Sequence, residues 1–496
     1  MNIALNERPS ACCRESFRQI KTVQEQAECI VPDVLEDVGQ IVSAHAQICL
    51  KSKDIGDHSA RIGAEAEIGV LYITESRDRV RCLVLSKSME IGFDAAAIEP
   101  DASAQVSLCC LGVQARAVNP RKISVELSVR AELSCWSERS FGIPSGTEGG
   151  RDDLQLRHSS EDVVLVTQLG EKSFVVNEQL PLDAEEEPTA ISFARVRLLC
   201  YDHQPIGSKI LLKGGAELEI GYETQEGNCP RRLEQCLPFS VLIDLPDDDC
   251  SLGRVILEPT ALYADLGDAI NGSRVIELEL HATAQFRFER RETIAFLSDA
   301  YSTVCPVFVE ESTAQVCLRR GEDALTVSAS DSVQVEQDRG EIVFLTSDIR
   351  SFAVREGKGE LSASVALLLR AKNGSFSALQ RLISFETPLP EDGGEILDAR
   401  IAALHAERSG EEITLDVSAV CDCARSETKE LRYLSAVELD TEKSFDPASL
   451  PSLTIARRRE RDLWTLAKLY HSSVEAIEKM EKEFPMSDGL LLIPRG

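Results

Sequence analysis

Three segments of the chain alternate strictly between apolar and polar residues. In residues 123–133 every second residue is apolar, and the same alternation recurs in residues 276–286 and 413–421. A period of two places neighbouring side chains on opposite faces of a strand. We therefore expect three β-strands, each with one buried face and one face toward solvent.

A turn signal precedes each of these strands, after another run of alternating apolar residues. The signals are Asn119-Pro120, Asn271-Gly272 and Ser409-Gly410, so each strand is predicted to close a β-hairpin. Short apolar segments bounded by charged or Gly/Pro-rich loops lie upstream of each hairpin, at residues 89–93, 239–243 and 382–385. This arrangement is typical of antiparallel β-sandwiches.

The chain also contains an internal repeat. The segment Gly63–Gly69 recurs as Gly215–Gly221, and a weaker copy follows at Lys358–Val365. The copies begin at residues 63, 215 and 358, and this spacing indicates three domain-sized units that follow one another. A chain of 496 residues is also too long for one hydrophobic core.

The sequence thus predicts a mainly β fold with three tandem antiparallel β-sandwich-like repeats and a small C-terminal α+β module. The predicted parts are an N-terminal segment at 1–32, repeats at 33–141, 160–292 and 294–435, a linker at 436–452 and the module at 453–496. We expect the N-terminal segment to be loosely attached, with some helical content. Because each repeat ends in its own hairpin, we expect each repeat to be separately stable.

From Leu453 the pattern changes to a strand, two helices and a strand. Asp462 is placed to cap a first helix whose apolar stripe consists of Leu463, Leu466, Ala467 and Tyr470. Ser472 and Glu475 have the spacing of a capping box for a second helix. Residues 490–493, followed by Pro494, are predicted to form the closing strand.

These residues resemble a LysM domain over Leu463–Tyr470, Ser472–Ile477 and Gly489–Pro494. The family usually has Gly-Asp before the first helix and Asn at the end of the second, where this chain has Glu460-Arg461 and Glu481. In the family, the loops that carry these residues help to form the glycan groove. The resemblance therefore implies a LysM-like fold in which the glycan-binding residues are replaced.

Repeated β-domains followed by a LysM-like module resemble the clostridial spore-coat morphogenetic proteins that carry SPOCS domains. The first repeat is the most similar, through Gly39–Val42, Gly63–Tyr72 and the Asn119-Pro120 hairpin. The resemblance implies a protein of the mother-cell cytoplasm that lies at the forespore surface and in the spore coat. Its module would bind the ATPase of the coat basement layer and recruit other coat proteins.

Composition and charge argue against several classes of function and location. The formal net charge of -30 argues against binding to nucleic acid or to anionic membrane surfaces. Glu7 and Arg8 stand where a signal peptide needs an apolar core, and no window approaches 18 uninterrupted apolar residues, so we expect a cytosolic protein without integral membrane contact. The 16 cysteines include no CxxC pair and are interpreted as reduced thiols that pack as small hydrophobic residues, with later oxidative cross-linking as the alternative.

No motif of a catalytic, cofactor or metal site is present, so the sequence predicts a protein that is not an enzyme and holds no cofactor or metal. The seven histidines, His45 among them, are scattered singly and are interpreted as ordinary surface residues. The acidic run Asp247–Asp249 lacks the spaced ligands and the tight glycine turn of a calcium loop, and we interpret it as a solvated loop.

A basic run directly before the first module helix is the strongest candidate for a binding site. A basic patch on an acidic protein suits an acidic partner surface. The predicted partner-binding residues are Arg457, Arg458, Arg459, Arg461, Leu463, Trp464 and Lys468. Two alternatives remain open: a cell-wall protein that binds peptidoglycan- or chitin-type glycans, and an unrelated cytosolic adaptor.

Overall fold

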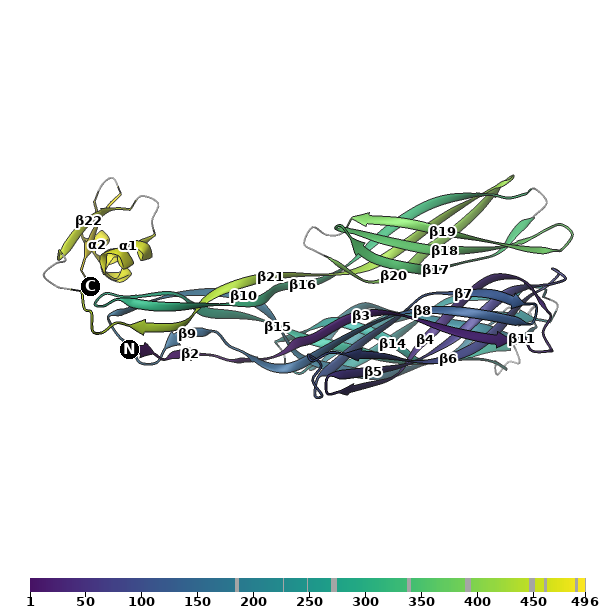
Figure 1. Ribbon diagram of the computed structural model, residues 1–496, viewed down its shortest axis with the longest axis horizontal. Coiled ribbons are helices and arrows are strands. Elements are labelled where there is room, and N and C mark those ends of the chain that lie inside the picture. Colours follow the sequence, from purple (N-terminus) through teal and green to yellow (C-terminus); the bar gives the residue numbers. More distant parts are fainter. Residues whose placement is uncertain are drawn as a thin grey trace.

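The computed structural model describes the chain except for residues 183–186, 226, 248, 269–273, 337–339, 389–393, 446–450, 459–461, 487–488 and 496. The described part is mainly β, as predicted, and contains two helices near the C-terminus. Figure 1 shows an elongated molecule with most of the sheets at one end and the C-terminal helices at the other.

Three sets of six strands follow each other in the same order. Each set has a long first strand, a three-stranded antiparallel sheet, and a hairpin whose second strand pairs with the first strand. The first set is β3 (Ser10–Ile30), β4 (Val38–Gly56), β5 (Ser59–Thr74), β6 (Val80–Asp94), β7 (Ser103–Asn119) and β8 (Lys122–Phe141). The second set is β10 (Leu154–Pro181), β11 (Pro188–Ile206), β12 (Lys209–Thr224), β13 (Arg231–Asp244), β14 (Cys250–Asp268) and β15 (Arg274–Ser302). The third set is β16 (Val307–Gln334), β17 (Glu341–Arg355), β18 (Lys358–Arg370), β19 (Phe376–Pro388), β20 (Glu395–Ser409) and β21 (Glu412–Leu439).

Each strand set has its own apolar core. In the first set, residues of β4, β5 and β6 share one buried cluster with residues of β7 and β8, and the other two sets have equivalent clusters. The three copies of the sequence repeat all lie in the middle strands of the three-stranded sheets, β5, β12 and β18. The repeat thus marks the strand that is flanked on both sides within its sheet.

The alternating strands are β8, β15 and β21, and their apolar faces are buried as predicted. The hairpin turns at Asn119-Pro120 and Ser409-Gly410 are confirmed, because Asn119 pairs with Lys122 and Ser409 with Glu412. The predicted turn at 271–272 lies outside the described residues. The polar faces are not wholly solvated, since Arg130, Glu132 and Gln285 are buried where neighbouring strand sets pack on them.

The expectation that residues 1–32 are loosely attached and partly helical is wrong. Most of this segment is β3, which pairs with β8 over its whole length, and two shorter strands precede it, β1 (Asn2–Ile3) and β2 (Leu5–Glu7). Val23 packs against the first core, but Lys21 and Glu25 occupy the same face of β3 and conceal the apolar alternation. Lys21 donates a hydrogen bond to the carbonyl of Gly92, and Glu25 forms an ion pair with Lys87; both partners lie in β6.

Long strands form a narrow extension that we call the stalk. The stalk comprises the N-terminal halves of β10 and β16, the C-terminal halves of β15 and β21, and the short strands β1, β2 and β9 (Pro144–Thr147) (Figure 1). Its own apolar clusters include Ile143, Leu154, Val163, Phe296, Leu297, Val316, Leu431 and Leu434. The predicted boundaries at 160, 292–294 and 435 therefore fall inside continuous strands.

The three strand sets are packed against one another. Gln47 of β4 accepts a hydrogen bond from the backbone N–H of Val196 in β11 (2.7 Å), and Arg195 forms an ion pair with Asp348 of β17. The first and third sets share a buried apolar cluster that includes Val42, Leu71, Phe344, Leu368 and Phe376. These buried contacts oppose the expectation of separately stable repeats, because an isolated repeat would expose them to water.

His45 is a further correction to the sequence interpretation. Its ring lies 4.1 Å from the ring of Phe193 and is buried between the first two strand sets. Burial and the nearby guanidinium of Arg195 lower the pKa of His45 to about 3, so the ring is neutral. His45 stands in a mostly apolar segment, residues 41–50, but nothing in that segment shows that another strand set will cover the ring.

Candidate partner-binding site

The C-terminal module has the predicted order of elements. It consists of β22 (Leu453–Arg457), α1 (Leu463–Tyr470), α2 (Val474–Glu483) and β23 (Leu490–Pro494), and the two strands pair antiparallel. A small core of Ala456, Leu466, Ala467, Ile477, Leu491 and Ile493 holds the helices to one face of the strands. The helical stripe predicted from the sequence is the face that is buried.

Two side chains cap the helices. Asp462 accepts a hydrogen bond from the backbone N–H of Thr465 (2.9 Å), which confirms the predicted first cap. This hydrogen bond, aided by the charge of Arg157, lowers the pKa of Asp462. The second cap is Ser473, whose hydroxyl accepts from Ala476, and not Ser472 as predicted. Ser472 is instead fully buried, and its carbonyl accepts a hydrogen bond from Tyr301 (2.8 Å).

The first helix docks onto the end of the stalk. Trp464 donates its indole N–H to Asp299 Oδ2 (2.8 Å), and Lys468 Nζ donates to Asp299 Oδ1 (2.6 Å). The ring of Trp464 also meets that of Tyr301 edge to face, with centroids 4.8 Å apart. Burial and the charge of Asp299 raise the pKa of Tyr301 to about 12, so its hydroxyl remains a donor at neutral pH. The first helix is therefore bound by residues of the same chain.

The candidate residues consequently divide into three groups. Leu463, Trp464 and Lys468 lie on the helix that faces the stalk. Arg457 and Arg458 are exposed at the end of β22. The remaining two candidates, Arg459 and Arg461, lie outside the described residues. Among the described residues of the predicted site, Arg457, Arg458 and Lys468 are exposed, and Lys468 is already paired with Asp299.

An exposed apolar face of the module was missed by sequence reasoning. Leu453 and Ile455 are 45% and 60% exposed on the face of β22 that points away from the helices. Ile455 is paired with Leu492 of β23, and Leu453 with Pro494, so this outer face is apolar across both strands. Arg457 continues the same face beside Leu490. The signal was present in the sequence, because larger apolar residues alternate with Thr454 and Ala456 in β22.

The described residues contain no group of three or more His, Cys, Asp or Glu side chains arranged to hold a metal ion. Within the same residues, neither helix is long and apolar enough to cross a membrane. No family model, curated protein or solved structure matches this chain. The site is therefore interpreted from its own geometry.

Proposed function

We propose that the chain is a non-enzymatic scaffold of spore-coat assembly. The three strand sets are interpreted as copies of one β-sandwich-like repeat, and the C-terminal module as a LysM-like domain. The scaffold works in the mother-cell cytoplasm at the forespore surface, where the module docks onto the ATPase of the coat basement layer and recruits other coat proteins.

The observation that carries this proposal is the outer face of β22 and β23. It combines exposed apolar side chains with Arg457 and Arg458, in a chain whose net charge is -30. Exposed apolar surface next to a basic rim suits a protein partner that offers an apolar patch with acidic neighbours. The first helix is a weaker candidate, because Asp299 and Tyr301 already engage Trp464 and Lys468.

Binding of the purified coat ATPase to variants of the full chain tests this proposal. Ile455→Ser and the double reversal Arg457→Glu/Arg458→Glu should each weaken binding by about tenfold, which corresponds to about 1.4 kcal/mol. Leu382→Ser is a matched control, since Leu382 is 64% exposed on β19 of the third strand set. A chain that ends at Pro451 should lose binding.

Pull-downs with chitin and peptidoglycan distinguish the glycan-binding alternative. We expect neither polymer to retain the full chain. If the chain ending at Pro451 keeps the ATPase, or if the intact module binds either glycan tightly, the docking proposal is wrong.

A further inference from the structure

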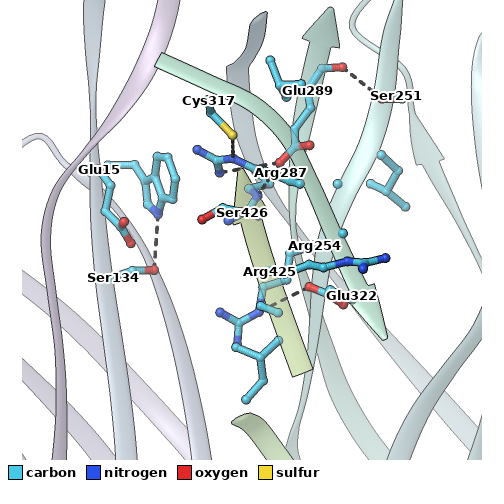
Figure 2. Close-up of a pocket in the computed structure, with 18 of the residues that line it drawn as sticks. Glu15, Ser134, Ser251, Arg254, Arg287, Glu289, Cys317, Glu322, Arg425 and Ser426 are labelled. Atoms are coloured by element: carbon cyan, nitrogen blue, oxygen red, sulfur yellow. Dashed lines mark hydrogen bonds and ion pairs between the residues drawn. The ribbon is translucent and has the colours of Figure 1, made fainter. Parts of the chain in front are cut away.

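A cavity of about 640 Å³ opens where the stalk joins the three strand sets (Figure 2). Its walls come from β3 and β8 of the first set, from β10, β11, β14 and β15 of the second, and from β16, β20 and β21 of the third. The volume lies within the range of small-molecule sites, about 300–1,000 Å³. A ligand here would contact all three strand sets at once.

The lining of the cavity is rich in arginine although the whole chain is strongly acidic. Seven arginines and four glutamates form the lining itself, and Glu132, Glu292 and Asp323 next to it pair with four of the arginines. The arginines are Arg18, Arg254, Arg287, Arg290, Arg291, Arg320 and Arg425, and the glutamates are Glu15, Glu289, Glu322 and Glu395.

Two pairs of these arginines each share one carboxylate. Glu289 lies 2.9 Å from Nε of Arg287 and 3.7 Å from a terminal nitrogen of Arg320. Arg254 and Arg18 both contact Glu132 behind the cavity wall. Arg18 and Arg254 also pair with Glu395 and Glu322, respectively. Since each guanidinium carries five N–H donors, Arg254, Arg287 and Arg320 still have donors for another anion.

Arg287 is largely buried and lies close to a second guanidinium group. Burial and the neighbouring guanidinium of Arg320 together lower the pKa of Arg287, although Glu289 opposes this shift. Burial raises the pKa of Glu15 and of Glu322, although neighbouring guanidinium groups oppose this shift. A bound anion would relieve the repulsion between the arginines.

Trp136 positions two of the arginines. The guanidinium carbons of Arg287 and Arg320 lie 5.5 Å and 5.7 Å from the centre of its ring. The indole N–H of Trp136 in turn donates a hydrogen bond to the hydroxyl of Ser134 (3.3 Å). Cation–π contacts of this kind favour planar arginine over lysine and hold the donors in fixed positions. The site is thus built before a ligand arrives.

We propose that this cavity binds a small anion with two linked phosphates, through Arg254, Arg287 and Arg320. Guanidinium groups bind phosphate oxygens in pairs, and clustered arginines are suited to a compact ligand with several negative charges. The bound anion fastens the three strand sets together at the base of the stalk. This role is independent of docking by the C-terminal module.

Calorimetric titration of the full chain with pyrophosphate tests the proposal, with sodium chloride at equal ionic strength as the reference. We expect saturable binding of pyrophosphate and a rise in the unfolding temperature that chloride does not reproduce. Arg320→Gln should weaken binding at least tenfold. Glu289→Gln should tighten it several-fold, because it releases two arginines from their carboxylate. Arg61→Gln, at an exposed arginine paired with Asp94 in the first strand set, should leave binding unchanged.

Opposite effects of the Arg320 and Glu289 variants separate a ligand site from a purely structural ion-pair network. If the wild-type chain shows no saturable binding beyond that of chloride, the proposal is wrong. It is also wrong if both variants change affinity in the same direction. A parallel titration with ADP distinguishes the source of the diphosphate: binding as tight as that of pyrophosphate supports a nucleotide ligand, and much weaker binding supports an inorganic one.

Discussion

Replacing Glu132 with alanine should lower the free energy of unfolding of the full chain by about 3–5 kcal/mol. The Glu132 side chain is only 3% exposed and contacts Arg18 (2.6 Å), Arg254 (3.1 Å) and Arg130 (3.5 Å). Burial raises the pKa of Glu132, but Arg254 and Arg18 outweigh burial, so its pKa lies below the usual value and the group is charged at neutral pH. Alanine would leave the buried guanidinium groups without their shared partner.

Urea denaturation at pH 7, followed by far-ultraviolet circular dichroism, measures this effect. Glu138→Ala is the matched control, because Glu138 is exposed on the same strand and its removal should change stability by less than about 0.5 kcal/mol. Because Glu132 links the first and second strand sets, we expect one transition that shifts as a whole. Two separate transitions, or a loss below about 1 kcal/mol, would show that the strand sets are not coupled through this carboxylate.

Glu258→Gln should remove a fall in stability that the wild-type chain shows as the pH rises from 5 to 8. Glu258 lies in β14, is 4% exposed, and accepts a hydrogen bond from the backbone N–H of Leu108 in β7 (3.1 Å). Burial raises its pKa to about 8. The folded chain therefore binds a proton that the unfolded chain releases near pH 4.5, so wild-type stability falls over this interval, by roughly 3 kcal/mol.

Free energies of unfolding at pH 5, 6, 7 and 8 measure this dependence. Glutamine keeps an oxygen for Leu108 and cannot ionise, so the variant should be close to wild type at pH 5 and more stable at pH 8. Burial lowers the pKa of the neighbouring Lys53 to about 8, which increases stability only as the pH rises above that value. Glu407→Gln, at an exposed position, should follow wild type. An equal slope for wild type and Glu258→Gln would contradict the burial argument.

The sequence predicted the strands whose apolar face meets their own core. Residues such as Leu127, Leu280 and Leu415 alternate regularly with polar residues because each packs within its own strand set. The position of β3 could not be predicted in the same way, because Lys21 and Glu25 share its inward face. Their partners on β6 lie far along the chain and leave no local pattern.

Contacts between strand sets could not be predicted from the sequence either. Glu132 and Gln285 alternate with apolar residues, and polar residues in such a pattern are expected to face water. The side chain of Gln285 is instead fully buried and bonds to both the N–H and the carbonyl of Val106 in the first set. A polar face that packs against another domain has the same sequence pattern as a solvated one.

In the candidate site too, features that depend on neighbouring residues were predicted, and features that depend on residues far along the chain were not. The cap at Asp462 and the stripe of α1 depend on neighbouring residues and were predicted from them. The contact of Trp464 with Asp299 depends on a stalk that brings β15 to the module, and nothing near Trp464 in the sequence signals it. The arginine-lined cavity likewise draws residues from strands of all three sets.

The position of the protein in a sporulating clostridial cell tests the scaffold proposal most directly. Fluorescent fusions of the full chain and of a chain ending at Pro451 would be imaged during coat assembly, with expression restricted to the mother cell. We expect the full chain to surround the forespore and the shortened chain to spread through the mother-cell cytoplasm. A full-length protein that stays evenly distributed, or that collects at the cell wall, would contradict the proposal.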